Sequence, residues 1–216
     1  MKFNEINIEL SEYSKKTIKL LHGKKNAKFQ IPRLYIPFGM SGFTPPIGAT
    51  KWNIDFNLQG WEEEGNPANV FYNWVRALED EVKHKIVDNA HEIFGTPKTF
   101  EQIDNMFNSN IKQSNNPIHP PKLRVKVAIT PDGAIAPDIF DEQSNPLDDG
   151  EPSNGLFIQR TAAAIVELGG VYFMNKMIGI TWKLVQMKLY EPSRLKGPHF
   201  VEDEEEPKIS GFQFMI

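Results

Sequence analysis

The sequence predicts an α+β protein built on a small antiparallel β-barrel, with a long helical insertion and an acidic C-terminal tail. Short apolar-alternating segments begin the chain, one amphipathic helical region interrupts them, and two long strands follow. Because helices interrupt the strands once and do not alternate with them, a doubly wound parallel sheet is disfavoured. A barrel also leaves few exposed sheet edges. We expect one domain over residues 1–201 and a tail over residues 202–216.

The first predicted strands are short. Residues 7–10 and 17–21 are brief alternating segments. Residues 29–38 are rich in side chains that favour strands, but Pro32 and Pro37 interrupt them, which predicts an edge position or a bent strand.

A loop and a half-buried strand follow. Residues 39–50 combine glycine, proline and threonine and are typical of a loop. Residues 52–59 then alternate without a break, which predicts a strand with one buried face. The apolar positions of this strand are Trp52, Ile54, Phe56 and Leu58.

The helical insertion is predicted over residues 66–108. Residues 66–95 form its main helix, with Pro67 at the first helical position and Gly95 at the C-terminal stop. A second helix is predicted over residues 100–107, where Thr99 and Gln102 have the spacing of a capping box. The apolar stripe of the main helix consists of Phe71, Trp74, Val75, Leu78, Val82, Ile86, Ile93 and Phe94.

The last part of the predicted barrel begins with a strand over residues 122–129. Its apolar residues alternate with the cations Lys122, Arg124 and Lys126, which we expect on the solvent side. The acidic segment 131–155 is predicted to be a mobile loop.

Two long strands joined by a turn close the domain, over residues 161–174 and 178–190. The adjacent glycines 169 and 170 predict a bulge or a sharp bend inside the first of them.

Charge is distributed unevenly along the chain. The net charge is −4, from 24 basic and 28 acidic residues. Five acids lie in residues 202–206, and seven lie in residues 132–151 without a base. Without these twelve acids, 16 acids remain against 24 bases, so the body of the protein carries +8. A basic body is suited to bind a polyanion, and the acidic segments are suited to compete for the same surface.

Several function classes are disfavoured. The absence of cysteine excludes disulfides, thiolate nucleophiles and zinc sites that need sulfur. We find neither a nucleotide-binding glycine motif nor a G-x-S-x-G nucleophile motif. No apolar run is long enough to span a bilayer, and the N-terminus has no apolar signal core, so we expect neither membrane insertion nor secretion. His84, Asp88 and His91 share a helix face, but their spacing is not that of a helical zinc motif, and we expect no metal or other cofactor.

Basic and aromatic side chains recur together on the predicted strands. Cations at two-residue spacing lie roughly 7 Å apart, close to the repeat of a nucleic-acid backbone. Flat rings near cations are suited to stack on bases of any sequence. Phe43 of the glycine-rich loop adds another ring. We also expect Trp182, Leu184, Gln186, Lys188 and Tyr190 to share the outward face of their strand. The predicted nucleic-acid-binding residues are Arg33, Tyr35, Lys51, Lys122, Arg124, Lys126, Trp182, Lys183, Lys188 and Tyr190.

Residues 170–200 resemble a signature of the single-stranded-DNA-binding proteins of nucleocytoplasmic large DNA viruses. The shared pattern is G-x-[ST]-W-K-x-x-Q-x-K-x-Y-x-P followed by L-K-G, and residues 51–58 resemble an earlier strand of that family. The resemblance implies an OB-fold, work in DNA replication or repair, and no catalysis. The matching residues are Gly179, Thr181, Trp182, Lys183, Gln186, Lys188, Tyr190, Pro192, Leu195, Lys196 and Gly197.

Three functions therefore stay open. The first is a non-catalytic, sequence-tolerant binder of single-stranded DNA. The second is a viral structural or protein-interaction protein, and the third is a metal-dependent nuclease that uses His84, Asp88 or the acidic segment. With the first function we expect viral replication proteins as partners through the tail, self-association, and a location in the cytoplasm or nucleus of a host cell.

Overall fold

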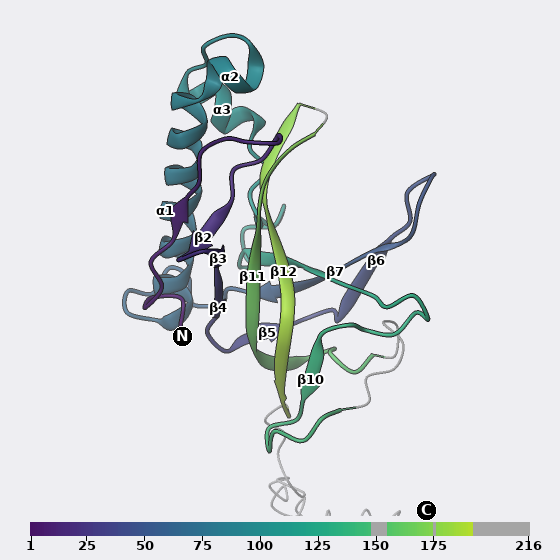
Figure 1. Cartoon of the computed structure of the whole chain (residues 1–216). Coiled ribbons are helices and arrows are strands. Elements are labelled where there is room, and N and C mark those ends of the chain that lie inside the picture. Colours follow the sequence, from purple (N-terminus) through teal and green to yellow (C-terminus); the bar gives the residue numbers. More distant parts are fainter. Residues whose placement is uncertain (148–154, 175, 192–216) are drawn as a thin grey trace, which may run out of the picture.

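The computed structural model describes residues 1–147, 155–174 and 176–191, and its centre is a closed five-stranded β-barrel with helices along one side (Figure 1). The barrel strands follow the order β12, β11, β5, β7 and β9, and β9 pairs with β12 to close it. This is the OB-fold-like α+β architecture that the sequence predicts, but the predicted antiparallel barrel is wrong at the closing pair, because β9 and β12 are parallel. The barrel strands are β5 (Leu34–Ile36), β7 (Lys51–Asn57), β9 (Lys122–Val127), β11 (Arg160–Met174) and β12 (Met177–Tyr190).

Shorter strands extend the barrel. Strand β4 (Lys28–Gln30) pairs with β11, and β8 (Ile111–Lys112) pairs with β9. Strand β6 (Met40–Phe43) pairs with β7 to make a hairpin that projects from the barrel (Figure 1). A separate three-stranded sheet contains β1 (Glu9–Leu10), β2 (Leu20–His22) and β3 (Lys25–Asn26).

Three helices form the insertion: α1 (Pro67–Asp88), α2 (Ala90–Phe94) and α3 (Phe100–Met106). Pro67 begins α1 as predicted, and Thr99 and Gln102 form the predicted capping box of α3. The predicted single helix over residues 66–95 is wrong at Asn89, which separates α1 from α2. The Asn89 side chain donates to the Lys85 carbonyl, so it competes with the backbone for that acceptor. No described helix is long and apolar enough to cross a membrane.

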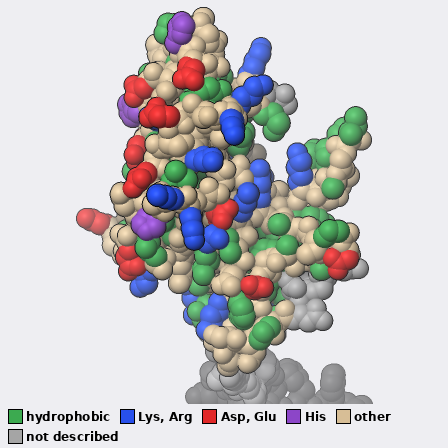
Figure 2. All heavy atoms as spheres, in the orientation of Figure 1, with side chains coloured by type: hydrophobic (Ala, Val, Ile, Leu, Met, Phe, Trp, Pro, Cys, Tyr) green, Lys and Arg blue, Asp and Glu red, His purple; other side chains and the backbone are tan. Residues whose placement is uncertain are grey.

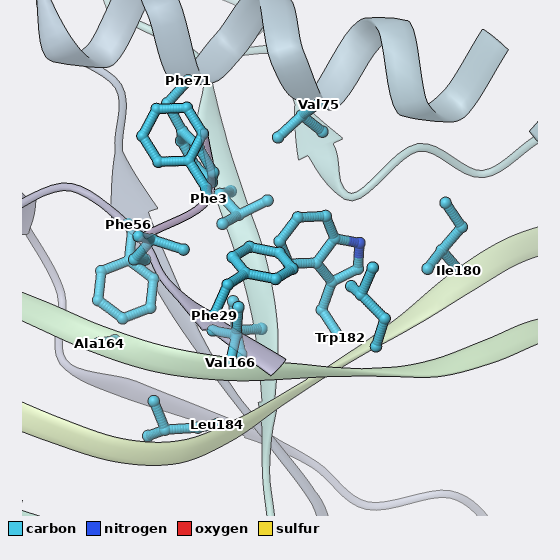
Figure 3. Packing of buried hydrophobic residues seen from close by; sticks show 14 of the residues in the cluster. Phe3, Phe29, Phe56, Phe71, Val75, Ala164, Val166, Ile180, Trp182 and Leu184 are labelled. Carbon is cyan, nitrogen blue, oxygen red and sulfur yellow. The ribbon is translucent and has the colours of Figure 1, made fainter. Parts of the chain in front are cut away.

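The apolar stripe of α1 packs onto the barrel and completes its core. Phe71, Val75, Val82 and Ile86 are fully buried. Trp182 of β12 lies between α1 and the barrel strands (Figure 3). Its ring makes edge contacts with Phe29 at 5.7 Å and Phe71 at 6.4 Å between ring centroids. Aromatic pairs of this geometry add to the stability that burial provides.

The prediction that Trp182 faces solvent is wrong, because a bulge divides β12. Strand β11 pairs Ile165 with Gln186 and Val166 with Leu184, so Val185 is an extra residue. An extra residue reverses which positions face outward. Trp182 and Leu184 on one side of the bulge therefore point into the core, and both are buried. The other three members of the predicted outward set, Gln186, Lys188 and Tyr190, are partly exposed.

Two predicted loops contain strands. Residues 40–43 of the glycine-rich segment form β6. Strand β10 (Asp138–Phe140) lies within the acidic segment and pairs in parallel with β12, because Ile135 and Ile139 bury their side chains there. The bulge predicted at Gly169 and Gly170 is confirmed, with Gly170 at a φ of +105°. The tail and residues 148–154 lie outside the described residues.

Candidate nucleic-acid interface

The outer surface of the barrel carries most of the predicted site residues. The alternation predicted for residues 122–129 is confirmed in β9, where Leu123, Val125 and Val127 are buried. Lys122, Arg124 and Lys126 therefore point outward, opposite the outward residues Asn57, Asp55 and Asn53 of β7.

Three cations meet where the barrel closes. Lys126 of β9 pairs with Lys183 of β12, and both Lys183 and Lys51 act on Lys126 electrostatically. Partial burial lowers the pKa of Lys126 below the ordinary lysine value, and the positive charges of Lys51 and Lys183 lower it further. None of the three makes an ion pair within the described residues. We call Lys51, Lys126 and Lys183 the lysine cluster. Glu167 lies across from Lys183 but forms its ion pair with Lys28 at 3.1 Å, so the cluster keeps a net positive charge that is suited to bind an anion.

Arg124, by contrast, is already paired. Its Nε and Nη2 atoms each donate to Asp55 at 2.8 Å, which is a bidentate ion pair across β7 and β9. Lys122 lies 3.9 Å from the same carboxylate. The predicted row of three cations therefore points outward as expected, but its central member already has an anionic partner.

Two exposed phenylalanines accompany these cations. Phe43 of β6 lies directly across from Lys51 on the same face, and its side chain is 63% exposed. Phe38 is 71% exposed, and Lys122 Nζ lies 5.1 Å from its ring centroid. Sequence reasoning missed Phe38, although an aromatic residue between Pro37 and Gly39 was a signal of a ring outside the core.

Arg33, directly before β5, forms a second group with Lys188 and Tyr190 of β12. The Arg33 guanidinium lies 3.8 Å from the centroid of the Tyr190 ring, and its Nε donates to Thr161 Oγ1 at 2.8 Å. Lys188 Nζ lies 5.9 Å from the same ring and donates to Ser144 Oγ. Lys188 and Tyr190 also line an open pocket of about 390 Å³, together with Ala163 and Ile165.

A row of outward residues joins the second group to β9. Register pairs Tyr190 with Thr161, Thr161 with Tyr35, Tyr35 with Asn57, and Asn57 with Lys122. Four strand-to-strand steps of about 4.8 Å give roughly 19 Å along the curved surface. The structure thus places nine of the predicted residues on one connected outer surface and excludes Trp182 from it.

The charge distribution agrees with this assignment. Figure 2 shows Lys and Arg side chains gathered over the middle of the molecule, whereas many Asp and Glu side chains lie along the side of helix α1. Within the described residues, no three His, Asp or Glu side chains gather to hold a metal ion. His84 instead packs its ring 4.7 Å from that of Phe100, centroid to centroid.

Comparison with known proteins finds likeness in structure. No family model matches the chain, and no curated protein matches it in sequence. A single-stranded DNA-binding protein from bacteriophage Enc34, solved in complex with single-stranded DNA, gives a TM-score of 0.49 at 9% identity, covering 88% of this chain and 99% of that one. The gp2.5 protein, a single-stranded DNA-binding protein encoded by bacteriophage T7, gives a TM-score of 0.52 at 10% identity, covering 87% of this chain and 100% of that one. The likeness to gp2.5 shows that the two chains share a fold.

Proposed function

We propose that this protein binds single-stranded DNA without sequence preference and without catalysis, through the outer surface of the barrel. The observation that carries the proposal is the lysine cluster, three cations without an ion-pair partner in the described residues, beside the exposed Phe43 ring. Lysines neutralise phosphates of any sequence. Aromatic rings stack on any base, because every base has a flat face.

The fold supports this proposal. The T7 protein that shares the fold over 87% of this chain is a single-stranded DNA-binding protein. Together with the signature in residues 170–200, this favours work in viral DNA replication or repair, with viral replication proteins as partners and a place at replication sites in the host cytoplasm or nucleus.

The direct test measures binding to a labelled oligo-dT by fluorescence anisotropy at two salt concentrations. We expect tight binding that weakens steeply with salt, and similar affinities for mixed-sequence single strands. Absence of binding would favour a structural or protein-interaction role. Degradation of the oligonucleotide that requires a divalent metal would favour the nuclease.

Substitution of the lysine cluster locates the interface. Changing Lys51, Lys126 and Lys183 together to Gln should flatten the slope of log K against log salt by about 2, at roughly 0.7 per lost phosphate contact. The matched control changes three exposed lysines of the N-terminal region, Lys15, Lys24 and Lys25, to Gln. If the two triple variants have equal slopes of log K against log salt, DNA does not bind at the lysine cluster.

A further inference from the structure

Tyr172 is a partly exposed aromatic residue beside the lysine cluster, and it is not among the residues that the sequence predicts to bind nucleic acid. It lies on the outer face of β11, opposite Gly179 of β12. Lys126 Nζ lies 5.7 Å from the centroid of its ring. Tyr172 therefore borders the place where we propose that phosphates bind.

Gly179 provides the space in which the Tyr172 ring lies. A Cβ atom at position 179 would come within 2.5 Å of the tyrosine hydroxyl oxygen and 2.7 Å of Cζ. Gly179 is not among the glycines with positive φ, so its backbone does not require glycine. The space for the ring is a sufficient reason for glycine at this position. The hydroxyl end of the ring thus lies against the backbone of Gly179.

Asn108 holds the far end of the ring. Its Nδ2 donates to the Tyr172 hydroxyl at 3.0 Å, while its Oδ1 accepts from Lys112 and its backbone N–H donates to Ile178 at 2.7 Å. These contacts fix the direction of the amide, so the hydroxyl acts as the acceptor. Within the described residues the hydroxyl proton has no acceptor of its own and is available to a ligand.

The cation over Tyr172 is held more loosely than the one over Tyr190. Arg33 covers the Tyr190 ring at 3.8 Å, whereas Lys126 lies 5.7 Å from the Tyr172 centroid, near the outer limit of about 6 Å for an effective cation–π contact. A phosphate is a stronger partner for Lys126 than the ring. An incoming nucleotide can therefore draw the ammonium aside and place its base on the ring.

We propose that Tyr172 is the seat for one unpaired nucleobase, with the adjoining phosphate on the lysine cluster and with Gly179 and Asn108 as positioning residues. This inference rests on the proposed function. It assigns to Tyr172 the stacking role that the sequence suggested for Trp182.

Four variants test the seat by affinity for labelled oligo-dT. Tyr172→Ala should weaken binding by roughly 5- to 150-fold, the usual cost of losing one base stack, and leave the salt slope unchanged. Tyr172→Phe should retain most of the affinity. Gly179→Ala should weaken binding although every aromatic residue remains, and combining it with Tyr172→Ala should add little. Tyr72→Ala, on α1, is the control and should bind as the unchanged protein does.

Photocrosslinking identifies the contact without removing a side chain. An oligo-dT that contains 5-iodouracil, irradiated while bound to the unchanged protein, should give a crosslinked peptide that contains Tyr172. This experiment tests the contact with Tyr172 even if Tyr172→Ala fails to fold. If the unchanged protein binds but Tyr172→Ala binds equally well, the seat is wrong and the proposed function stands. If the unchanged protein does not bind oligo-dT, both are wrong. A crosslink confined to other residues would also overturn the seat.

Discussion

Arg124 shows that an outward position on a strand does not by itself make a cation free to bind a ligand. The neighbouring strand determines whether Arg124 is free, because Asp55 lies directly across from Arg124 and accepts two hydrogen bonds from it. Lys51 and Lys126 face Phe43 and Asn53, which carry no charge, and Glu167 across from Lys183 forms its ion pair with Lys28. The charge that a ligand meets on this surface therefore depends on cross-strand neighbours more than on the sequence of any one strand.

Replacing Asp55 should strengthen binding to single-stranded DNA. Asp55→Asn removes a negative charge from the interface and releases Arg124 for a phosphate, so the salt slope should steepen by up to roughly 0.7. Fluorescence anisotropy at several salt concentrations measures this. Glu101→Gln, an exposed acid on α3, is the control and should have no effect. Weaker binding by a protein with an unchanged melting temperature would contradict the prediction.

Lys126 should make binding sensitive to alkaline pH. Its pKa is lowered by burial and by two neighbouring lysines, and a bound phosphate would raise it again. The affinity should therefore be highest at pH values below the pKa of Lys126 in the free protein. It should fall as pH rises through that pKa, which is below the ordinary lysine value of about 10.4. Lys126→Arg keeps its charge in this range and should bind with less pH dependence. If the affinity of the unchanged protein and that of Lys126→Arg depend on pH in the same way, Lys126 does not contact the ligand.

At the scale of the element, the bulge in β12 and the β6–β7 hairpin set the two ends of the interface. Val185 turns Lys188 and Tyr190 outward while Trp182 stays in the core. The hairpin projects beyond the barrel (Figure 1). Phe43, the last residue of β6, is exposed and lies across from Lys51. Both are local departures from a closed barrel, and both add surface to the candidate interface.

Phe43 should contribute to binding and little to stability. Phe43→Ala should cost roughly 1–3 kcal/mol of binding free energy, the usual cost of one lost base stack, without a change in melting temperature. Ile47→Ala is a matched control on the same hairpin, because its side chain is 92% exposed and is not aromatic. Equal losses of affinity from both variants would mean that the hairpin contributes apolar area and not stacking.

At the scale of the whole molecule, charge is divided between a basic body and acidic segments. The sequence contains five acids in residues 202–206, which lie outside the described residues. A polyanionic segment and DNA are attracted to the same cations. We therefore expect the tail to compete with DNA for the proposed surface.

Removing the tail should raise affinity for single-stranded DNA. Truncation after Val201 deletes the five acids, and the gain should be largest at low salt, where screening is weakest. A full-length protein with residues 202–206 changed to glutamine separates charge from length and should behave like the truncated protein. A truncated protein that stays folded and binds no better would show that the tail does not compete for this surface.

The sequence by itself determined which side chains of β7 and β9 face outward, where α1 begins, and how α3 is capped. These features depend on alternation, on Pro67 and on the pairing of Thr99 with Gln102, all of which are local. The tertiary structure alone decided that Trp182 is buried, that Arg124 is paired, and that Lys126 meets Lys183 from a distant part of the chain. The reason is that a bulge and a cross-strand pair are defined by the partner strand, and the spacing within one strand contains no information about its partner.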